Sequence, residues 1–331
     1  MKAAFFEQPG PPDVIQYGDV PKPEVLPHQV LVKIAATSLN PIDTYIRAGA
    51  NYWPLPSPFV VGCDFAGTVE AVGAEVGEGI SVGERVWGSN QGLLGRQGTF
   101  AEYAAVDAEL CYPSPDDVDD KCLAACSLVG ITAHLGVVGK AKVSKGDTVF
   151  VRGGVGGVGS MVLQMCRALG AIVIATAGSP EKAALCKELG AEHVINYNQQ
   201  DIASTLGELA PGGVDVFWET LRDPDFDLAV GALADGGRMV LMAGRDARPE
   251  FPVGPFYVKG LSMHGVVMFK ATPAEQHAAA RDINRWLAEG KLRSVIDRVL
   301  PLSKAAEAHQ LQEDHTVGKK SLLAGKIVLT P

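Results

Sequence analysis

The chain has 331 residues, more than the roughly 250–300 that one hydrophobic core usually serves, so we expect two domains. A formal net charge of −9 without any Lys/Arg cluster argues against nucleic acid or anionic lipid as a partner. With 47% hydrophobic residues, 20% charged residues and apolar runs that stop short of the roughly 20 residues needed to cross a bilayer, the composition predicts a soluble globular protein with no membrane partner.

The N-terminus and the cysteines predict the compartment. The first residues, "MKAAFFEQPGPPD", lack the apolar core of a secretory signal, so we expect a cytoplasmic location. The six cysteines are widely spaced and form no Cys-x-x-Cys motif, which is typical of a reducing environment without disulfides.

Residues 1–122 predict a β-rich domain, because short apolar segments, typical of strands, alternate with Pro- and Gly-rich segments, typical of turns. Near residue 122 the composition changes. The stretch "CLAACSLVGITAHLGVV" is rich in Ala and Leu and predicts a helix, and it follows "YPSPDD", whose Ser and Asp residues are typical of helix starts. We therefore expect a domain boundary there, with a second domain over residues 123–266 and a return to the first domain over 267–331.

The second domain reads as alternating strands and helices. Strand-like runs begin near six positions: Asp147, Ala171, His193, Val214, Arg238 and Leu261. This alternation predicts an α/β fold with a doubly wound parallel sheet. One of its helices carries start signals, with Ser179 as N-cap and Pro180 at the first helical position. After residue 270 we expect two helices, in "PAEQHAAARDINRWLAEG" and "SKAAEAHQLQ", and a last strand in "GKIVL".

The stretch "RGGVGGVG", residues 152–159, predicts a dinucleotide site. Gly154, Gly156 and Gly159 match the spacing G-x-G-x-x-G, and the loop lies between a predicted strand and a predicted helix. There the backbone N–H groups and the helix N-terminus are able to bind a pyrophosphate.

The end of the next strand favours NADPH over NADH. An NAD site usually carries Asp or Glu about 20 residues past the glycines to bind the ribose 2′-OH, whereas this chain has Ala177. Gly178, Ser179 and Lys182 offer space, a hydroxyl and a cation to an additional phosphate. The alternative is that Ser179 only caps the helix and Lys182 is only a solvated charge.

The chain resembles the medium-chain dehydrogenase/reductases, and within them the zinc-independent quinone oxidoreductases of the zeta-crystallin-like branch. The resemblance covers nearly the whole chain and lies in "NPIDTYIRAG", "VVGCDFAGTVEAVG", "VGERVWG", "GTFAEYA", "GITAH", "GGVGGVG", "ELGAEHVINY", "GGRMVLMAG" and "AGKIVLTP". It implies a GroES-like β domain built from both chain ends and a central Rossmann domain. It also implies a homodimer, formed through the strand in "LSMHGVVMF".

Zinc-dependent members of the superfamily differ from this chain at their metal-binding positions. They carry Cys where Asn40 stands and His-Glu where Cys63 and Asp64 stand, and their lobe of four cysteines is absent here. We therefore predict no zinc and a buried, inert Cys63 thiol in apolar surroundings. Without a metal to polarise the substrate, the natural acceptor is already electrophilic: a quinone, or a C=C bond conjugated to a carbonyl.

The resemblance also assigns the site. Asn40 and Tyr45 would line the acceptor site, Tyr52 would hydrogen-bond the acceptor oxygen or lend a proton, and Thr132 would lie near the nicotinamide. Tyr52 is equally compatible with an ordinary packed aromatic. His134 replaces the tyrosine usual at its position, as a titrating group or a structural one.

The residues assigned to NADPH are Gly153, Gly154, Gly156, Gly157, Val158, Gly159, Gly178, Ser179, Lys182, Tyr197, Gly244, Arg245, Met268 and Phe269. Lys319 or Lys320 would reach the 2′-phosphate. Two alternatives remain open: a zinc-independent enoyl-thioester reductase, and a non-enzymatic protein of the crystallin or RNA-binding type.

Overall fold

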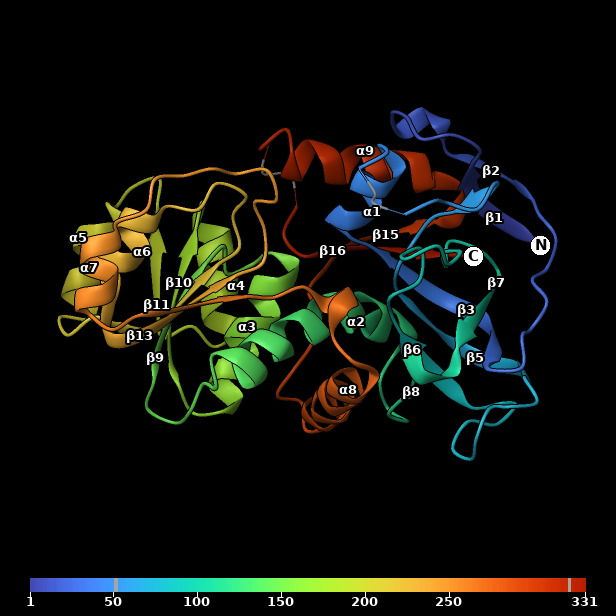
Figure 1. The fold of residues 1–331 in the computed structure, drawn as a ribbon, viewed down its shortest axis with the longest axis horizontal. Coiled ribbons are helices and arrows are strands. Elements are labelled where there is room, and N and C mark those ends of the chain that lie inside the picture. The colour runs from blue at the N-terminus through green and yellow to red at the C-terminus, as the bar shows by residue number, and fades with distance from the viewer. Residues whose placement is uncertain (51–52, 321–322) are drawn as a thin grey trace. The chain divides into compact units, whose positions relative to one another are not determined.

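The computed structural model describes residues 1–50, 53–320 and 323–331, and these residues form two compact units (Figure 1). Unit 1 comprises Met1–Leu128, Ala271–Ala288 and Arg293–Pro331, and unit 2 comprises Val129–Lys270 and Glu289–Leu292. The boundaries at 128/129 and 270/271 fall a few residues after the expected ones at 122/123 and 266/267.

Unit 1 is built on two sheets. Its larger sheet has the strand order β15-β16-β3-β5-β6-β8, with β7 paired to β3, and its smaller sheet has the order β2-β1-β4. The strands are β1 Lys2–Phe6, β2 Gln16–Asp19, β3 Gln29–Leu39, β4 Phe59–Val60, β5 Phe65–Val72, β6 Arg85–Gly88, β7 Tyr103–Asp107, β8 Cys111–Pro113, β15 Ile296–Pro301 and β16 Lys326–Thr330. Figure 1 shows β16, from the C-terminal end, beside β3, with which it pairs in antiparallel fashion.

The core of unit 1 follows from the alternation of side chains along β3. Val30, Val32 and Ile34 point to one face and pack with Phe65 and Val69 of β5. The helical segments of this unit are η1 Pro12–Val14, α1 Pro41–Arg47, η2 Ala108–Leu110, α8 Pro273–Ala288, η5 Leu302–Lys304 and α9 Ala305–Thr316. Both helices expected after residue 270 are therefore present, as α8 and α9.

Unit 2 has the predicted doubly wound sheet. Its strands are parallel in the order β11-β10-β9-β12-β13-β14. They are β9 Thr148–Arg152, β10 Ile172–Ala177, β11 His193–Asn196, β12 Val214–Glu219, β13 Leu233–Leu241 and β14 Ser262–Gly265. Successive strands are added on one side of β9 up to β11 and on its other side from β12 onward, so the strand order reverses between β9 and β12. Dinucleotides bind at this switch point in doubly wound sheets.

The helices of unit 2 fall into two groups. Helix α3 contacts α4, and α6 contacts both α5 and α7. Apolar residues of the second group pack on Phe150, Ile174 and Phe217 of the sheet. The helical segments are α3 Gly157–Ala168, α4 Pro180–Leu189, α5 Ile202–Leu209, α6 Phe226–Ala232, α7 Val253–Val258 and η4 Met268–Lys270.

Helix α2 (Asp120–His134) continues into the π-helical turn η3 (Leu135–Lys140). Together they form a longer apolar helical segment than expected from the sequence. The segment 120–140 has 21 residues, and its most apolar 18-residue window has a mean hydropathy of 1.8, so by length and composition it is able to cross a membrane. The prediction that every apolar run stops short of this length was wrong. In the structure 78% of its most apolar window is buried, as in a core helix.

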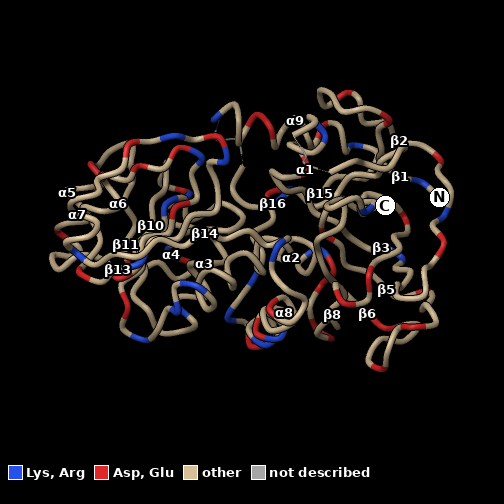
Figure 2. The backbone as a smooth tube through the Cα atoms, viewed as in Figure 1, with Lys and Arg blue, Asp and Glu red and all other residues tan. Residues whose placement is uncertain are grey.

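Charged residues are interleaved along both units. Figure 2 shows Lys and Arg interspersed with Asp and Glu along the described backbone of both units. All six cysteines are free thiols, and five of them are buried.

His309 of α9 is a buried titratable group that opposes folding at low pH. Neither of its ring nitrogens has a hydrogen-bond partner within the described part of the chain. Burial, reinforced by the nearby Arg47, lowers the pKa of His309 from 6.5 to about 3. The unfolded chain thus gains a proton near pH 6.5 that the folded chain gains only near pH 3. Because the folded pKa is depressed, His309 reduces stability progressively as the pH falls from about 6.5 to about 3.

We expect His309→Leu to flatten this dependence. The free energy of unfolding of the unsubstituted chain should fall more steeply than that of the variant, by up to about 1.4 kcal/mol per pH unit. Urea unfolding at a series of pH values from 7 to 4 measures this difference, with the partly exposed His193→Leu as control. Parallel curves for the unsubstituted chain and His309→Leu would contradict the assignment.

Candidate active site

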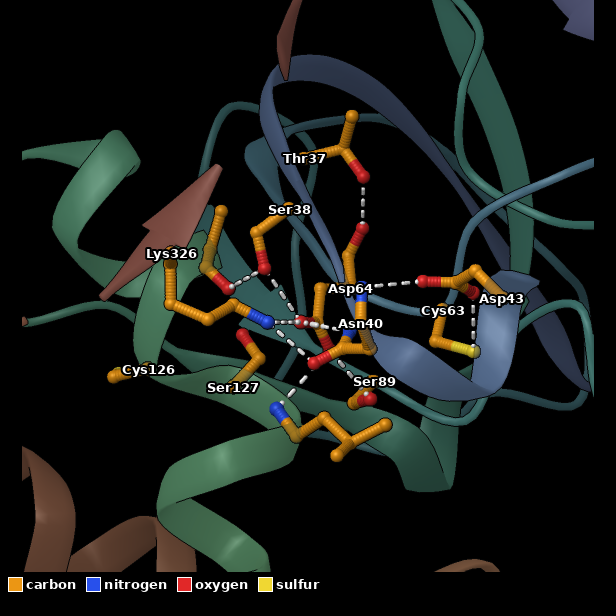
Figure 3. A network of polar contacts seen from close by, with 12 residues as sticks. Thr37, Ser38, Asn40, Asp43, Cys63, Asp64, Ser89, Cys126, Ser127 and Lys326 are labelled. Atoms are coloured by element: carbon orange, nitrogen blue, oxygen red, sulfur yellow. Dashed lines mark hydrogen bonds and ion pairs between the residues drawn. The ribbon is translucent and has the colours of Figure 1, made fainter. Parts of the chain in front are cut away.

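A buried polar network lies where β3 ends and α1 begins, and Asp64 is at its centre (Figure 3). Asp64 precedes β5, and its Oδ2 accepts hydrogen bonds from Ser38 Oγ at 2.6 Å and Asn40 Nδ2 at 2.7 Å. Its Oδ1 accepts from Ser89 Oγ at 2.7 Å and from the Leu128 amide at 3.0 Å. Both carboxylate oxygens are therefore fully used inside unit 1.

Lys326, the first residue of β16, brings a cation to this carboxylate. Its Nζ donates to Asn40 Oδ1 and lies 3.7 Å from Asp64 Oδ2, and the residue is 4% exposed. Burial lowers the pKa of Lys326, whereas the carboxylates of Asp64 and Asp43 act to raise it. Hydrogen bonds to both partners lessen the cost of burying such an ion pair, and here Asp64 accepts four of them and Lys326 donates to Asn40.

Asp43 and Cys63 form the second half of the network. Asp43 Oδ2 accepts from the Asn40 amide at 2.7 Å, and Asp43 Oδ1 accepts from Cys63 Sγ at 2.9 Å. Burial raises the pKa of Asp43 to about 7, although both hydrogen bonds act to lower it. Burial, together with the charge of Asp43, also raises the pKa of Cys63. Cys63 is thus a buried thiol, but the apolar surroundings expected for it were wrong, because its neighbour is a carboxyl group.

The predicted residues of the acceptor side occupy different environments. Asn40 is fully buried, and its amide is bonded at both ends, to Asp64 and to Lys326. Tyr45 lies on α1 and is half-buried, and Thr132 lies on α2 and is 5% exposed. Tyr52 lies outside the described residues. His134, at the end of α2, is 5% exposed.

Sequence reasoning missed Lys326, Asp43 and Ser89. A signal existed for Asp43, because an N-cap Asn followed three residues later by an acid resembles a capping box, and Asp43 does bond the Asn40 amide. Lys326 had no comparable signal, since it contacts Asn40 across 286 positions of sequence.

The glycine loop of unit 2 has the close backbone packing that the motif requires. Gly153 has φ of +85°, and its amide donates to Thr176 Oγ1 at 2.9 Å. A Cβ on Gly159 would lie 2.1 Å from the Gly153 carbonyl oxygen. Gly156 is the N-cap of α3, so the loop leads directly into a helix N-terminus. This arrangement fits the pyrophosphate of a dinucleotide.

The turn after β10 brings together residues expected at the adenosine end of the cofactor. A Cβ on Gly178 would lie 2.2 Å from Tyr197 Oη, so the two residues are in close contact. Ser179 caps α4, since its hydroxyl accepts from the Lys182 amide at 3.3 Å. A hydrogen bond with Ser179 also lowers the pKa of the exposed Glu181. The structural role of Ser179 as a cap is present, and it is compatible with phosphate binding.

The remaining residues that the sequence predicts to bind the cofactor lie beyond the later strands or near the chain end. Gly244, with φ of +81°, follows β13, and Arg245 Nε lies 3.6 Å from Asp246 Oδ1. Met268 and Phe269 lie in η4. Of the two candidate lysines, Lys320 Nζ lies 3.1 Å from Asp314 Oδ2 within unit 1.

Comparison with known proteins identifies a domain family for each of two ranges of the chain. Residues 26–116 match the alcohol dehydrogenase GroES-like domain, and residues 157–285 match the family described as zinc-binding dehydrogenase. The quinone oxidoreductase of Sus scrofa is 34% identical over 321 residues, covering 95% of each chain. The chain belongs to the quinone oxidoreductases of the medium-chain dehydrogenase/reductase superfamily. This oxidoreductase therefore has the predicted GroES-like and Rossmann domains.

Solved structures of related proteins have the same fold over their full length. An NAD-dependent alcohol dehydrogenase superimposes with a TM-score of 0.90 at 32% identity, covering 100% of both chains. A mycobacterial protein complexed with NADPH superimposes with a TM-score of 0.87 at 31% identity, also covering 100% of both chains. These similar structures thus include one protein named as NAD-dependent and one complexed with NADPH.

The matched family description names zinc, and the residues of this oxidoreductase do not fit that metal. The oxygen atoms of Asn40 and Asp64 are engaged by the Lys326 ammonium and by four other donors. Cys63 Sγ donates to Asp43 Oδ1 at 2.9 Å, so this sulfur is also engaged within the network. Over residues 1–50, 53–320 and 323–331, no group of three or more His, Cys, Asp or Glu side chains is placed to hold a metal ion.

Proposed function

We propose that this oxidoreductase transfers a hydride from NADPH to a quinone, or to a C=C bond conjugated to a carbonyl, without zinc. The observation that carries the proposal is the buried Lys326 ammonium bonded to Asn40 beside Asp64. Because Lys326 and other donors occupy the oxygen atoms of Asn40 and Asp64, these oxygens are not open to a metal ion that would polarise an alcohol or aldehyde. The acceptor must then be electrophilic on its own, as quinones and conjugated enones are.

NADPH is the cofactor of this chain, and when bound it supplies the hydride. The residues of unit 2 fit it, since the glycine loop offers backbone amides and the N-terminus of α3 to the pyrophosphate. Ala177 leaves no carboxylate to repel a 2′-phosphate, and Ser179 and Lys182 supply a hydroxyl and a cation near the same turn. Gly244, Arg245, Met268 and Phe269 complete the cofactor site.

On the acceptor side the chain needs to orient the substrate and to stabilise charge on its oxygen. We assign Tyr52 as the hydrogen-bond donor to this oxygen, where negative charge develops as the hydride arrives, and Asn40 and Tyr45 to the lining of the acceptor site. Thr132 is assigned to a position near the nicotinamide. A proton delivered to the oxygen through this hydroxyl completes the two-electron reduction of a quinone, whereas an enone takes up the hydride at its β-carbon and the proton at its α-carbon.

We further propose that the protein is a cytoplasmic homodimer. Strand β14 pairs only with β13 in the described part of unit 2, so its other edge is available to a second copy. Pairing of two such edges would continue the sheet across a two-fold axis.

Steady-state oxidation of NADPH against ortho-quinones, para-quinones, alkenals and enones tests the proposed function. We expect turnover with at least one of these classes, in proportion to acceptor concentration at low concentration. The experiment would contradict the proposal if the protein bound NADPH but oxidised it with none of them, a result that would favour a binding or structural role.

A further inference from the structure

A buried lysine side chain lies in unit 1 beside Asn40, Cys63 and Asp64. The family resemblance implies that zinc-dependent members carry their metal ligands at these three positions. In this chain the Lys326 ammonium is bonded to one of these residues and lies 3.7 Å from the carboxylate of another (Figure 3). The cation of the site is thus part of the polypeptide.

The position of the ammonium determines how the Asn40 amide is turned. Asn40 Oδ1 accepts from Lys326, so Nδ2 faces Asp64, to which it donates at 2.7 Å. The reverse orientation would place the amide NH₂ against an ammonium and the amide oxygen against a carboxylate, leaving two repulsive contacts in a buried site. Lys326 and Asp64 together therefore select one rotamer of Asn40.

Asn40 in turn determines where α1 begins. It is the N-cap of that helix, and its backbone amide donates to Asp43 Oδ2 at 2.7 Å. Asp43 also accepts from Cys63, which ties the first turn of α1 to the segment before β5. Tyr45 lies one turn further along the same short helix. A shift of Asn40 would therefore move the helix that carries Tyr45.

We propose that Lys326 is a positioning residue for the reduction: its ammonium replaces a metal ion as the internal cation that fixes Asn40 and, through Asn40, the start of α1. The role of α1 in catalysis rests on the proposed function. Burial lowers the pKa of Lys326, so placing a charged group here is costly, and the bonds to Asn40 and Asp64 offset that cost.

A double-mutant cycle tests whether Lys326 acts through Asn40. We expect Lys326→Met to lower kcat with quinone at least tenfold while the Kd for NADPH changes less than twofold. The double variant Asn40→Ala/Lys326→Met should be no slower than Asn40→Ala alone, because the effect of Lys326 passes through the amide. Losses in kcat that multiply, or a wild-type kcat in Lys326→Met, would overturn the proposal.

Two additional variants separate positioning from folding. Lys326→Gln retains an N–H donor for Asn40 Oδ1 and should recover part of the kcat lost in Lys326→Met, and it serves as the test variant if Lys326→Met does not fold. A folded Lys326→Gln as slow as Lys326→Met would contradict orientation by hydrogen bonding. Lys33→Met, on the exposed side of β3, is the control for loss of a positive charge and should keep the wild-type kcat.

A crystal structure of Lys326→Gln, together with one of Lys326→Met where that variant folds, keeps this test independent of the proposed reaction. In Lys326→Met we expect Asn40 Oδ1 to be left without its donor, so that the Asn40 side chain and the first turn of α1 move, while Lys326→Gln keeps Asn40 in place with its 2.7 Å contact to Asp64. An unchanged Asn40 in Lys326→Met, or a lost contact in Lys326→Gln, would overturn the inference. Failure of the unsubstituted enzyme to reduce any quinone, enal or enone would instead contradict the proposed function alone.

Discussion

Asp64→Ala is expected to lower the free energy of unfolding by about 3–5 kcal/mol. The substitution leaves the buried Lys326 ammonium without its counter-charge and removes the acceptor of four hydrogen-bond donors. Buried donors without a partner retain their full desolvation penalty, so the loss should exceed that of any single hydrogen bond.

Urea denaturation of Asp64→Ala against the unsubstituted chain measures this loss. Asp117→Ala, at an exposed position of the same unit, is the matched control and should change the free energy of unfolding by no more than about 0.5 kcal/mol. Equal midpoints for Asp64→Ala and Asp117→Ala would show that the network does not stabilise unit 1.

Lys182→Ala is expected to weaken NADPH binding about 10- to 100-fold, the equivalent of one charge-assisted hydrogen bond of roughly 1.5–3 kcal/mol. NADH lacks the 2′-phosphate, so its Kd should stay unchanged. Fluorescence titration of both nucleotides measures the two constants. Lys187→Ala removes an exposed lysine from the same helix α4 and is expected to bind both as the unsubstituted chain does.

Two results would count against this assignment of the phosphate site. One is an unchanged NADPH affinity in Lys182→Ala. The other is an unsubstituted chain that binds NADH as tightly as NADPH, which would place this chain with the relative named for NAD.

Much of the fold was predictable because its signals are local. The strands of unit 2 begin within one or two residues of the expected positions, except β13, which starts at Leu233 rather than near Arg238. Helix α4 begins where Ser179 and Pro180 indicate. The glycine loop was predictable for the same reason, since its strand, turn and helix are adjacent in sequence.

The polar network was less predictable because its members come from distant segments. Lys326 opens a strand whose sequence, "KIVLT", predicts only that the apolar residues are buried. A lysine at a strand end is usually exposed, and only pairing of β16 with β3 brings it to Asn40. The carboxyl neighbour of Cys63 was missed likewise, because Asp43 is 20 positions away.

The most direct test of the central claim measures zinc content and NADPH-dependent quinone reduction on the same sample, before and after dialysis against a chelator. We predict substoichiometric zinc and an unchanged kcat after dialysis, because the cation of the site is the Lys326 ammonium. A kcat that falls on dialysis and returns when zinc is added would contradict this account.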